Sequence, residues 1–118
     1  MATRAGLGWI GKCALLVTEE YGSALRISSL ITDAPLECNA PQKASRCGNC
    51  RACAEHCPSG AVTGEAWSAG IVRARLIDAE RCAETARALC RERFGKQATL
   101  CGKCIVVCPY TRRSLKRT

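Results

Sequence analysis

The sequence predicts an α+β fold, in which an N-terminal β-hairpin segment precedes a cysteine-rich domain with an inserted helix. Three features predict it: two apolar runs separated by a turn near the N-terminus, two cysteine motifs farther along, and a helical pattern between those motifs. We divide the chain into residues 1–40, a glycine-rich loop and hairpin, and residues 41–118, the cysteine domain.

The hairpin is predicted between Cys13 and Leu36. An apolar run, CALLVT, is followed by a turn at residues 19–23 and by a second apolar run, ALRISSLI. Apolar and β-branched residues on both sides of a turn are typical of two antiparallel strands. A polar connector that contains Pro41 then leads into the cysteine-dense half of the chain.

The inserted helix is predicted between the two cysteine motifs. Asp78 is a residue type that commonly caps a helix N-terminus, and Gly95 is the type that commonly follows a helix C-terminus. Four residues recur every fourth position between them and therefore share one face: Cys82, Ala86, Cys90 and Phe94. We expect this face to point inward.

Composition favours metal ligation over disulfide bonds. An aromatic content of 4% in 118 residues leaves few large side chains for a core, while cysteine occurs eleven times. The N-terminal segment lacks an apolar run of signal-peptide length and no stretch could span a bilayer, so we expect a cytoplasmic protein with no membrane partner. A reducing cytosol disfavours disulfides, and an odd number of cysteines cannot pair completely within one chain.

The first cysteine motif, CGNCRACAEHCP, indicates the chemistry. Cys47, Cys50, Cys53 and Cys57 have the spacing C-x2-C-x2-C-x3-C-P of bacterial ferredoxins. Three of these thiolates reach one [4Fe-4S] cluster, and in two-cluster ferredoxins the fourth binds the other cluster. The motif therefore predicts a bacterial-ferredoxin-like domain with two [4Fe-4S] clusters, and requires a second set of cysteines.

The second motif, LCGKCIVVCP, supplies that set with one position missing. Its three cysteines match the last three positions of the ferredoxin run, and Ala98 stands where the first cysteine would be. Reciprocal exchange of the last cysteine of each motif then gives the ligands. Cluster 1 is assigned Cys47, Cys50, Cys53 and Cys108, and cluster 2 is assigned Cys57, Cys101 and Cys104.

The eighth ligand has four candidates, which are Cys13, Cys38, Cys82 and Cys90. We choose Cys82, because it opens the predicted helix and can approach a cluster from outside the motif. Cys90 lies eight residues on, about 12 Å along a helix axis, so the two cannot easily reach the same cluster. Cys90 is then expected to be a small buried apolar residue.

Two other interpretations are weaker. Zinc also binds CxxC pairs, but structural zinc sites seldom need three cysteines at x2 spacing and a CP end twice over. Gly6, Gly8 and Gly11 satisfy the dinucleotide pattern G-x-G-x-x-G, and with Lys12 they approach a phosphate-binding loop. Both nucleotide motifs need a preceding strand, for which five residues are too few, and the second needs Ser or Thr where Cys13 stands.

These clusters predict low-potential, one-electron transfer. We expect a redox donor of the flavodoxin or ferredoxin type and an acceptor protein or domain as partners. The formal net charge of +8 treats every thiol as neutral, so it is a weak guide by itself. Arg46, Arg51 and Lys103 flank the motifs, and we expect them to raise the cluster potential and attract acidic donors.

Six segments also resemble, in order, the C-terminal half of epoxyqueuosine reductases: AGLGWIGK, YGS, LITDAPL, CGNCRACAEHCPSGAV, ERC and LCGKCIVVCPY. The similarity covers nearly the whole chain. In that family a cobalamin-binding domain is joined to a two-cluster ferredoxin domain, and electrons pass to cobalamin, which reduces an epoxide on a modified tRNA base. Reductive dehalogenases share a similar arrangement. The resemblance also implies a separate cysteine at the position of Cys82.

The resemblance implies an alternative function, as a fragment or subunit of a cobalamin-dependent reductase that acts in tRNA modification. Only this interpretation implies tRNA as a partner. The family has a further domain before AGLGWIGK, with most of the cobalamin pocket and its acidic proton donor, and we expect this chain to lack it. The chain also has CPYT where many relatives have CPWN. We assign no catalytic residue, and propose Gly8, Lys12, Tyr21 and Ser23 as one wall of a corrinoid site.

Overall fold

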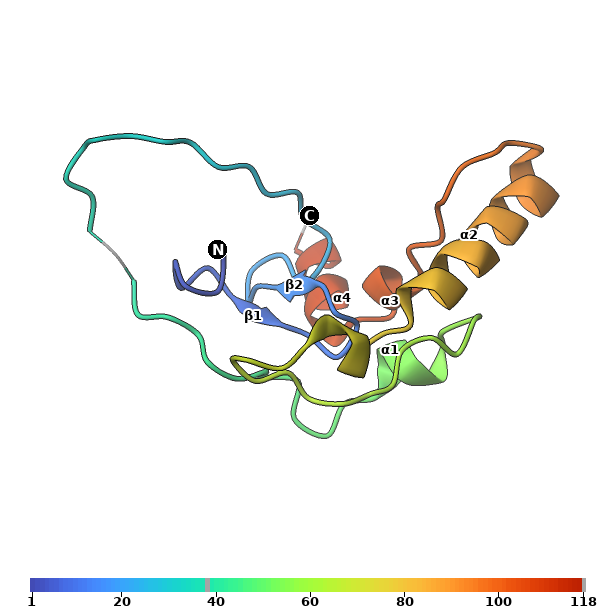
Figure 1. Ribbon diagram of the computed structural model, residues 1–118, viewed down its shortest axis with the longest axis horizontal. Helices are drawn as coiled ribbons and strands as arrows, with labels where there is room; N and C mark the ends of the chain where they lie inside the picture. The colour runs from blue at the N-terminus through green and yellow to red at the C-terminus, as the bar shows by residue number, and fades with distance from the viewer. Residues whose placement is uncertain (38, 118) are drawn as a thin grey trace.

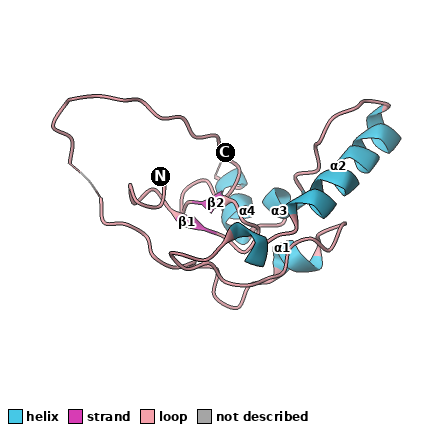
Figure 2. Ribbon diagram, in the orientation of Figure 1, coloured by secondary structure: helices cyan, strands magenta, loops and turns pink. Residues whose placement is uncertain are grey.

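The elements of this chain are short and are joined by long loops. The computed structural model describes residues 1–37 and 39–117. In chain order its elements are β1 (Trp9–Ile10), β2 (Leu16–Val17), α1 (Ala52–Glu55), the 3-10 helix η1 (Arg73–Arg75), α2 (Ala79–Phe94), α3 (Lys103–Val106) and α4 (Pro109–Leu115). The hairpin, α3 and α4 occupy the middle of the molecule, α2 projects to one side, and the loop after the hairpin arches out on the other (Figures 1 and 2). Among the described helices, none has the length and apolar character needed to cross a membrane.

The hairpin forms earlier in the chain than the sequence predicts. Trp9 pairs with Val17 and Ile10 with Leu16 in an antiparallel register. The run CALLVT does contain β2, but the second predicted strand, ALRISSLI, lies in the exposed loop, so the prediction was wrong about the partner strand. The physical reason is the burial of Trp9, which is 1% exposed, whereas Ile27 and Leu30 stay exposed.

The turn between the strands brings a lysine and a cysteine into the interior. The Gly11 N–H donates to the Leu15 carbonyl at 2.9 Å, and Ala14 adopts a left-handed φ of 58°. A left-handed conformation costs about 1–2 kcal/mol for a residue with a Cβ, so packing must hold this turn in place. As a result Lys12 and Cys13, at the tip of the turn, are both buried.

The hairpin packs against α4 through aromatic side chains. The Trp9 and Tyr110 rings meet edge to face with centroids 5.0 Å apart, and the Arg46 guanidinium lies 5.6 Å from the Trp9 ring centroid. The Tyr110 hydroxyl donates to the Arg46 carbonyl at 3.2 Å. Residues from both ends of the chain therefore enclose the start of the first cysteine motif.

A second contact joins the N-terminal segment to α4. The Ser23 N–H donates to the Thr111 hydroxyl oxygen at 3.1 Å, the two hydroxyls are 3.3 Å apart, and both residues are buried. Gly22 makes room for this contact, because a Cβ at Gly22 would collide with the backbone nitrogen of Thr111. The contact lies between the backbones of Gly22 and Thr111, so a clash at this point could be relieved only if one of the two backbone segments shifted.

The substitution Gly22→Ala is therefore expected to destabilise the cluster-loaded protein by about 2 kcal/mol or more, from overpacking added to backbone strain. Urea titration followed by cluster absorbance and tryptophan fluorescence measures the loss. Gly95→Ala is the matched control, because Gly95 has φ 62° against 63° at Gly22, but a Cβ at Gly95 would meet nothing within 4 Å. Equal losses in the two variants would show that backbone strain, and not the contact with Thr111, is responsible.

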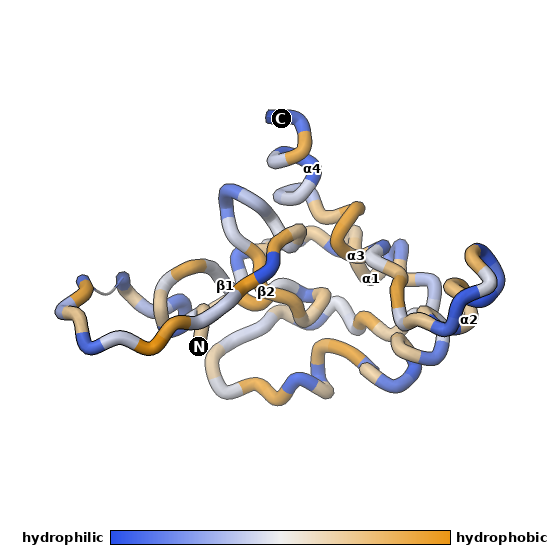
Figure 3. Tube along the Cα trace, turned by 90° about the horizontal axis from the view of Figure 1, so that it is seen from above, coloured by the Kyte–Doolittle hydropathy of each residue, from blue (hydrophilic) through white to orange (hydrophobic). Residues whose placement is uncertain are grey.

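Helix α2 has the predicted ends. The Asp78 carboxylate accepts a hydrogen bond from the Arg81 N–H at 3.0 Å, and Gly95 follows the helix in a left-handed conformation. Cys90 is buried, as predicted, but Phe94 is 68% exposed, so the prediction of an inward-facing Phe94 was wrong. The end of α2 extends beyond the rest of the fold (Figure 1), and much of the α2 trace has the colour of hydrophilic residues in Figure 3.

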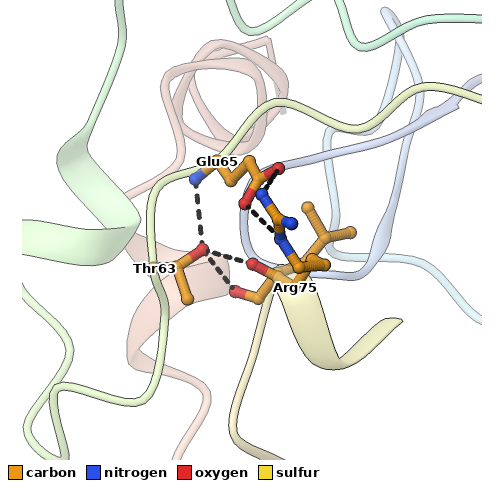
Figure 4. A network of polar contacts seen from close by, with 4 residues as sticks. Thr63, Glu65 and Arg75 are labelled. Atoms are coloured by element: carbon orange, nitrogen blue, oxygen red, sulfur yellow. Dashed lines mark hydrogen bonds and ion pairs between the residues drawn. The ribbon is translucent and has the colours of Figure 1, made fainter. Parts of the chain in front are cut away.

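The segment before α2 is fixed by a polar network. The Thr63 hydroxyl donates to the Arg75 carbonyl at 2.8 Å, and the Arg75 guanidinium donates to both Glu65 carboxylate oxygens at 3.1 and 2.9 Å (Figure 4). Val62 and Ile77 form an isolated antiparallel bridge beside it. The exposed ion pair contributes little to stability, but the network and the bridge join the two backbone segments that precede α2, the helix that carries Cys82.

Candidate metal centres

The first cysteine motif folds as a turn followed by one turn of helix. The Cys50 N–H donates to the Cys47 carbonyl at 3.1 Å, α1 carries Cys53, and the Cys57 N–H donates to the Ala54 carbonyl at 3.3 Å. Pro58 follows and cannot donate a hydrogen bond, so the helical turn ends there. The chain is thus curled so that the first three cysteines face one region.

The second motif repeats this geometry. Helix α3 carries Cys104, and the Cys108 N–H donates to the Ile105 carbonyl at 3.2 Å. Gly102 and Gly48 both have left-handed φ angles, of 68° and 54°. Open space surrounds both glycines, so conformation rather than crowding accounts for their residue type. Helices α1 and α3 contact each other, which brings the two motifs together.

Thiols from both motifs line a cavity of about 240 Å³, which we name the first thiol cavity. It is bounded by Cys47, Cys50, Cys53, Cys104 and Cys108 together with Gly11, Lys12, Cys13, Val17, Pro109, Tyr110 and Arg113. The predicted ligands of cluster 1 are therefore all found around one space. The hairpin and α4 supply most of the rest of the lining.

A cavity of about 220 Å³, the second thiol cavity, lies on the other side of Cys104. Its sulfur-bearing residues are Cys57, Cys82, Cys101 and Cys104, and the rest of its lining includes Leu15, Val62, Ile77 and Ala86. The predicted ligands of cluster 2 thus also surround one space. Cys104 lines both cavities, so the two spaces are neighbours.

The donor set of each cavity fits an iron–sulfur cluster. Six thiols line the first cavity and four line the second instead of closing on one point, and among residues 1–37 and 39–117 no three His, Cys, Asp or Glu side chains converge as they would on a single ion. None of the described cysteines forms a disulfide. Backbone N–H groups also point at the sulfurs, which is the hydrogen bonding that cluster sites use.

Hydrogen bonds in the first thiol cavity favour ionised thiols. A hydrogen bond from the Cys13 thiol lowers the pKa of Cys53 to about 6, and the same donor lowers the pKa of Cys104 to about 7. In return, hydrogen bonding to Cys104 and Cys53 raises the pKa of Cys13 far above its ordinary value. Of these three thiols, Cys13 is therefore the last to lose its proton.

The thiols of the second cavity differ in their surroundings. Burial raises the pKa of Cys57, but hydrogen bonds from the Ser59 hydroxyl and from backbone N–H groups outweigh it and lower the pKa. The Ser59 oxygen is 3.2 Å from the Cys57 sulfur and accepts the Ala61 N–H. Burial raises the pKa of Cys82, and the nearby thiolates Cys57, Cys104 and Cys101 add to the rise.

The four residues proposed for a corrinoid wall are not brought together. Gly8 packs against the Val17 backbone, Ser23 is bonded to Thr111, and Lys12 lines the first thiol cavity. Tyr21 lines a separate cavity of about 390 Å³ beside the hairpin. The remaining candidate for the eighth ligand, Cys38, lies outside the described residues, and Cys90 lines neither thiol cavity.

Sequence reasoning missed the roles of three residues at these centres. Cys13 was one of four candidates for the eighth ligand, and its thiol hydrogen-bonds to both Cys53 and Cys104. Ser59 carries a recognisable signal, because a hydroxyl two residues after a ligand commonly bonds locally. Lys12 contacts residues distant in sequence, and no local pattern could have indicated that.

A basic groove of about 400 Å³ adjoins the second thiol cavity. His56, Arg93, Phe94, Leu100, Cys101 and Lys103 contribute to its lining. Cys101 and Lys103 line both the groove and the second thiol cavity, and both are exposed. A predicted cluster ligand is therefore reachable from solvent on a positively charged face.

Comparisons with known proteins agree with this geometry. Residues 46–111 match the family model described as a 4Fe-4S double cluster binding domain. The chain is 36% identical over 113 residues to the epoxyqueuosine reductase of Listeria monocytogenes, covering 95% of this chain and 29% of that protein. It is 34% identical to the epoxyqueuosine reductase of Escherichia coli, covering 97% of this chain and 30% of that protein.

Solved structures give the same result. The chain superimposes on the epoxyqueuosine reductase of Bacillus subtilis with a TM-score of 0.66 and 29% identity, covering 94% of this chain and 29% of that one. For the enzyme from Streptococcus thermophilus the TM-score is 0.58 at 29% identity, with the same coverage. The chain thus spans about three tenths of the length of the relatives that it matches.

Proposed function

Because this chain belongs to the family of 4Fe-4S double cluster binding domains, and so holds two [4Fe-4S] clusters, we propose that it is an electron-transfer module that passes single low-potential electrons between protein partners. The observation that carries the proposal is the pair of adjacent thiol cavities that share Cys104. Two redox centres that share a wall are suited to relaying an electron.

The proposal includes the ligands. Cluster 1 would be held by Cys47, Cys50, Cys53 and Cys108, and cluster 2 by Cys57, Cys82, Cys101 and Cys104. The grouping of each set around one cavity supports this assignment. The electrostatic influence of Cys57, Cys101 and Cys104 on Cys82 supports the choice of Cys82 as the eighth ligand.

The clusters, when bound, supply reversible one-electron chemistry, and the chain sets its conditions. Hydrogen bonds to sulfur raise a cluster potential, and here the Ser59 hydroxyl and the N–H of Ala61 act near Cys57. Buried apolar residues such as Val62 and Ile77 keep water from the second cavity.

Metal analysis with redox titration tests the function. Anaerobically reconstituted protein should contain about eight irons, and potentiometric EPR should show two one-electron couples. Reduced flavodoxin should then bleach the cluster absorbance, and added cytochrome c should restore it. Clusters that are present but exchange no electrons with either protein would show that the domain has a structural function instead.

The proposed donor is an acidic flavodoxin or ferredoxin that docks over the basic groove. Lys103→Glu should slow cluster reduction by flavodoxin roughly three- to tenfold at low ionic strength, because it replaces an attractive charge with a repulsive one. Stopped-flow absorbance measures the rate. Lys43→Glu is the matched control, since Lys43 is exposed and lines neither thiol cavity. Equal slowing by both variants, or persistence of the effect at high salt, would contradict local steering.

The second candidate function is that of a part of a cobalamin-dependent epoxyqueuosine reductase that acts on tRNA in the cytoplasm. The match to epoxyqueuosine reductases over 95% of this chain favours it. The cavity beside the hairpin, lined by Leu7, Leu16, Tyr21, Leu25 and Ile27 among others, is the surface we propose to face the corrinoid. A shift of the hydroxocobalamin absorption bands on mixing would support this function, and unshifted bands at high protein concentration would exclude cobalamin binding by this chain alone.

A further inference from the structure

Lys12 is a buried lysine with an unusual environment. It sits in the turn between β1 and β2 and is 7% exposed, and its neighbours Gly11 and Cys13 are buried as well. Lysine is almost never fully buried unless a partner compensates its charge. The left-handed Ala14 in the same turn shows that the backbone accepts strain to keep this tip inside.

The contacts of Lys12 do not compensate its charge. Its ammonium donates to the Gly48 carbonyl at 2.8 Å, which satisfies one of its three donors. In residues 1–37 and 39–117 the ion pairs are Arg46 with Glu19 and Arg75 with Glu65, so no described carboxylate pairs with Lys12. An unpaired buried ammonium is costly, so the structure calls for an anion beside it.

The surroundings identify the anion. Lys12 lines the first thiol cavity, and its hydrogen-bond acceptor Gly48 lies in the motif loop between two of the proposed ligands. A cluster with four thiolates carries a net negative charge, which becomes more negative on reduction.

We propose that Lys12 is the buried counter-ion of cluster 1 and raises its reduction potential above that of cluster 2. This inference rests on the ligand assignment under the proposed function. A fixed positive charge in a water-poor site favours the reduced, more negative state. The lysine beside the second cavity, Lys103, is exposed, so solvent screens its charge. The electron is therefore held preferentially at cluster 1, next to the hairpin.

The test is the potential of each cluster in Lys12→Met, which removes the charge and keeps much of the shape. The couple that survives in Cys82→Ala is assigned to cluster 1. At a fixed solution potential, the ratio of reduced to oxidised cluster 1 should fall at least tenfold, which is about 59 mV for a one-electron couple. Cluster 2 should change less than about twofold. Lys43→Met is the matched control and should leave both clusters unchanged, because Lys43 is exposed and lines neither thiol cavity.

Each outcome separates the inference from its premise. If wild-type protein lacks two clusters, or Cys82→Ala keeps both, the ligand assignment fails. If the clusters are as proposed and Lys12→Met shifts neither couple, or shifts both equally, the counter-ion role is wrong. If Lys12→Met cannot retain cluster 1, Lys12→Arg decides between charge and shape. Retention of iron and sulfide with arginine would show that the positive charge is required. Loss of the cluster in both variants would show that the shape of the lysine side chain is required, and the counter-ion role would be wrong.

Discussion

Removal of the iron is expected to unfold residues 47–110. The small core around Ala61, Val62 and Ile77 is completed by partly buried residues, of which three are proposed ligands: Cys53, Cys57 and Cys82. Helices α1 and α3 have four residues each, too few to be stable alone. Bound clusters would thus supply contacts that the small core and the short helices lack.

Chelation of iron under anaerobic, reducing conditions provides the measurement. The far-UV circular dichroism of α2 should diminish, and urea titration of the apo protein should show no cooperative transition. Re-addition of iron and sulfide to the same sample is the control, because it should restore both the clusters and the transition. A cooperative apo transition with an unchanged m-value would mean that side-chain packing alone holds the fold.

The substitution Cys82→Ala is expected to remove cluster 2 while leaving cluster 1. The iron content should fall from about eight to about four per chain, and the reduced-state EPR signal should change from that of two interacting clusters to that of one. The reason is that α2 is the element that carries a thiol into the second cavity from outside both motifs. A missing thiolate leaves an iron without a protein ligand.

Cys90→Ala is the matched control for this substitution. Cys90 lies on the same helix, is 2% exposed and lines neither thiol cavity, so its loss should cost packing and no iron. If Cys90→Ala also removes a cluster, destabilisation of α2 accounts for both results. If Cys82→Ala retains about eight irons, the eighth ligand is another residue and the assignment must change.

The sequence predicted most reliably those features that are encoded over a few residues. The cysteine spacings indicated two clusters, and Asp78 and Gly95 marked the ends of α2, because capping depends on residues within one turn of each other. The family match over residues 46–111 agrees with the spacing of the motifs. Neither feature depends on contacts with distant parts of the chain.

The features that the sequence could not predict depend on long-range contacts. Trp9 is buried by packing against Tyr110, about a hundred residues along the chain, and this contact decides which strands pair. Lys12 looked like part of a glycine-rich loop, and only its bond to Gly48 places it at the first thiol cavity. Phe94 fitted a helical face, but the fold leaves this side chain exposed at the end of α2.

The loop that leaves the hairpin has a topological consequence. Residues 28–37 arch away from the other elements (Figure 1), whereas Ser23 ahead of them is fastened to Thr111. Continuity of the chain through this loop is therefore dispensable for the contacts on either side of it. The hairpin and the cysteine domain should therefore reassemble when they are supplied as two separate polypeptides. The brown colour of the clusters that develops on mixing would then report that the two polypeptides have assembled.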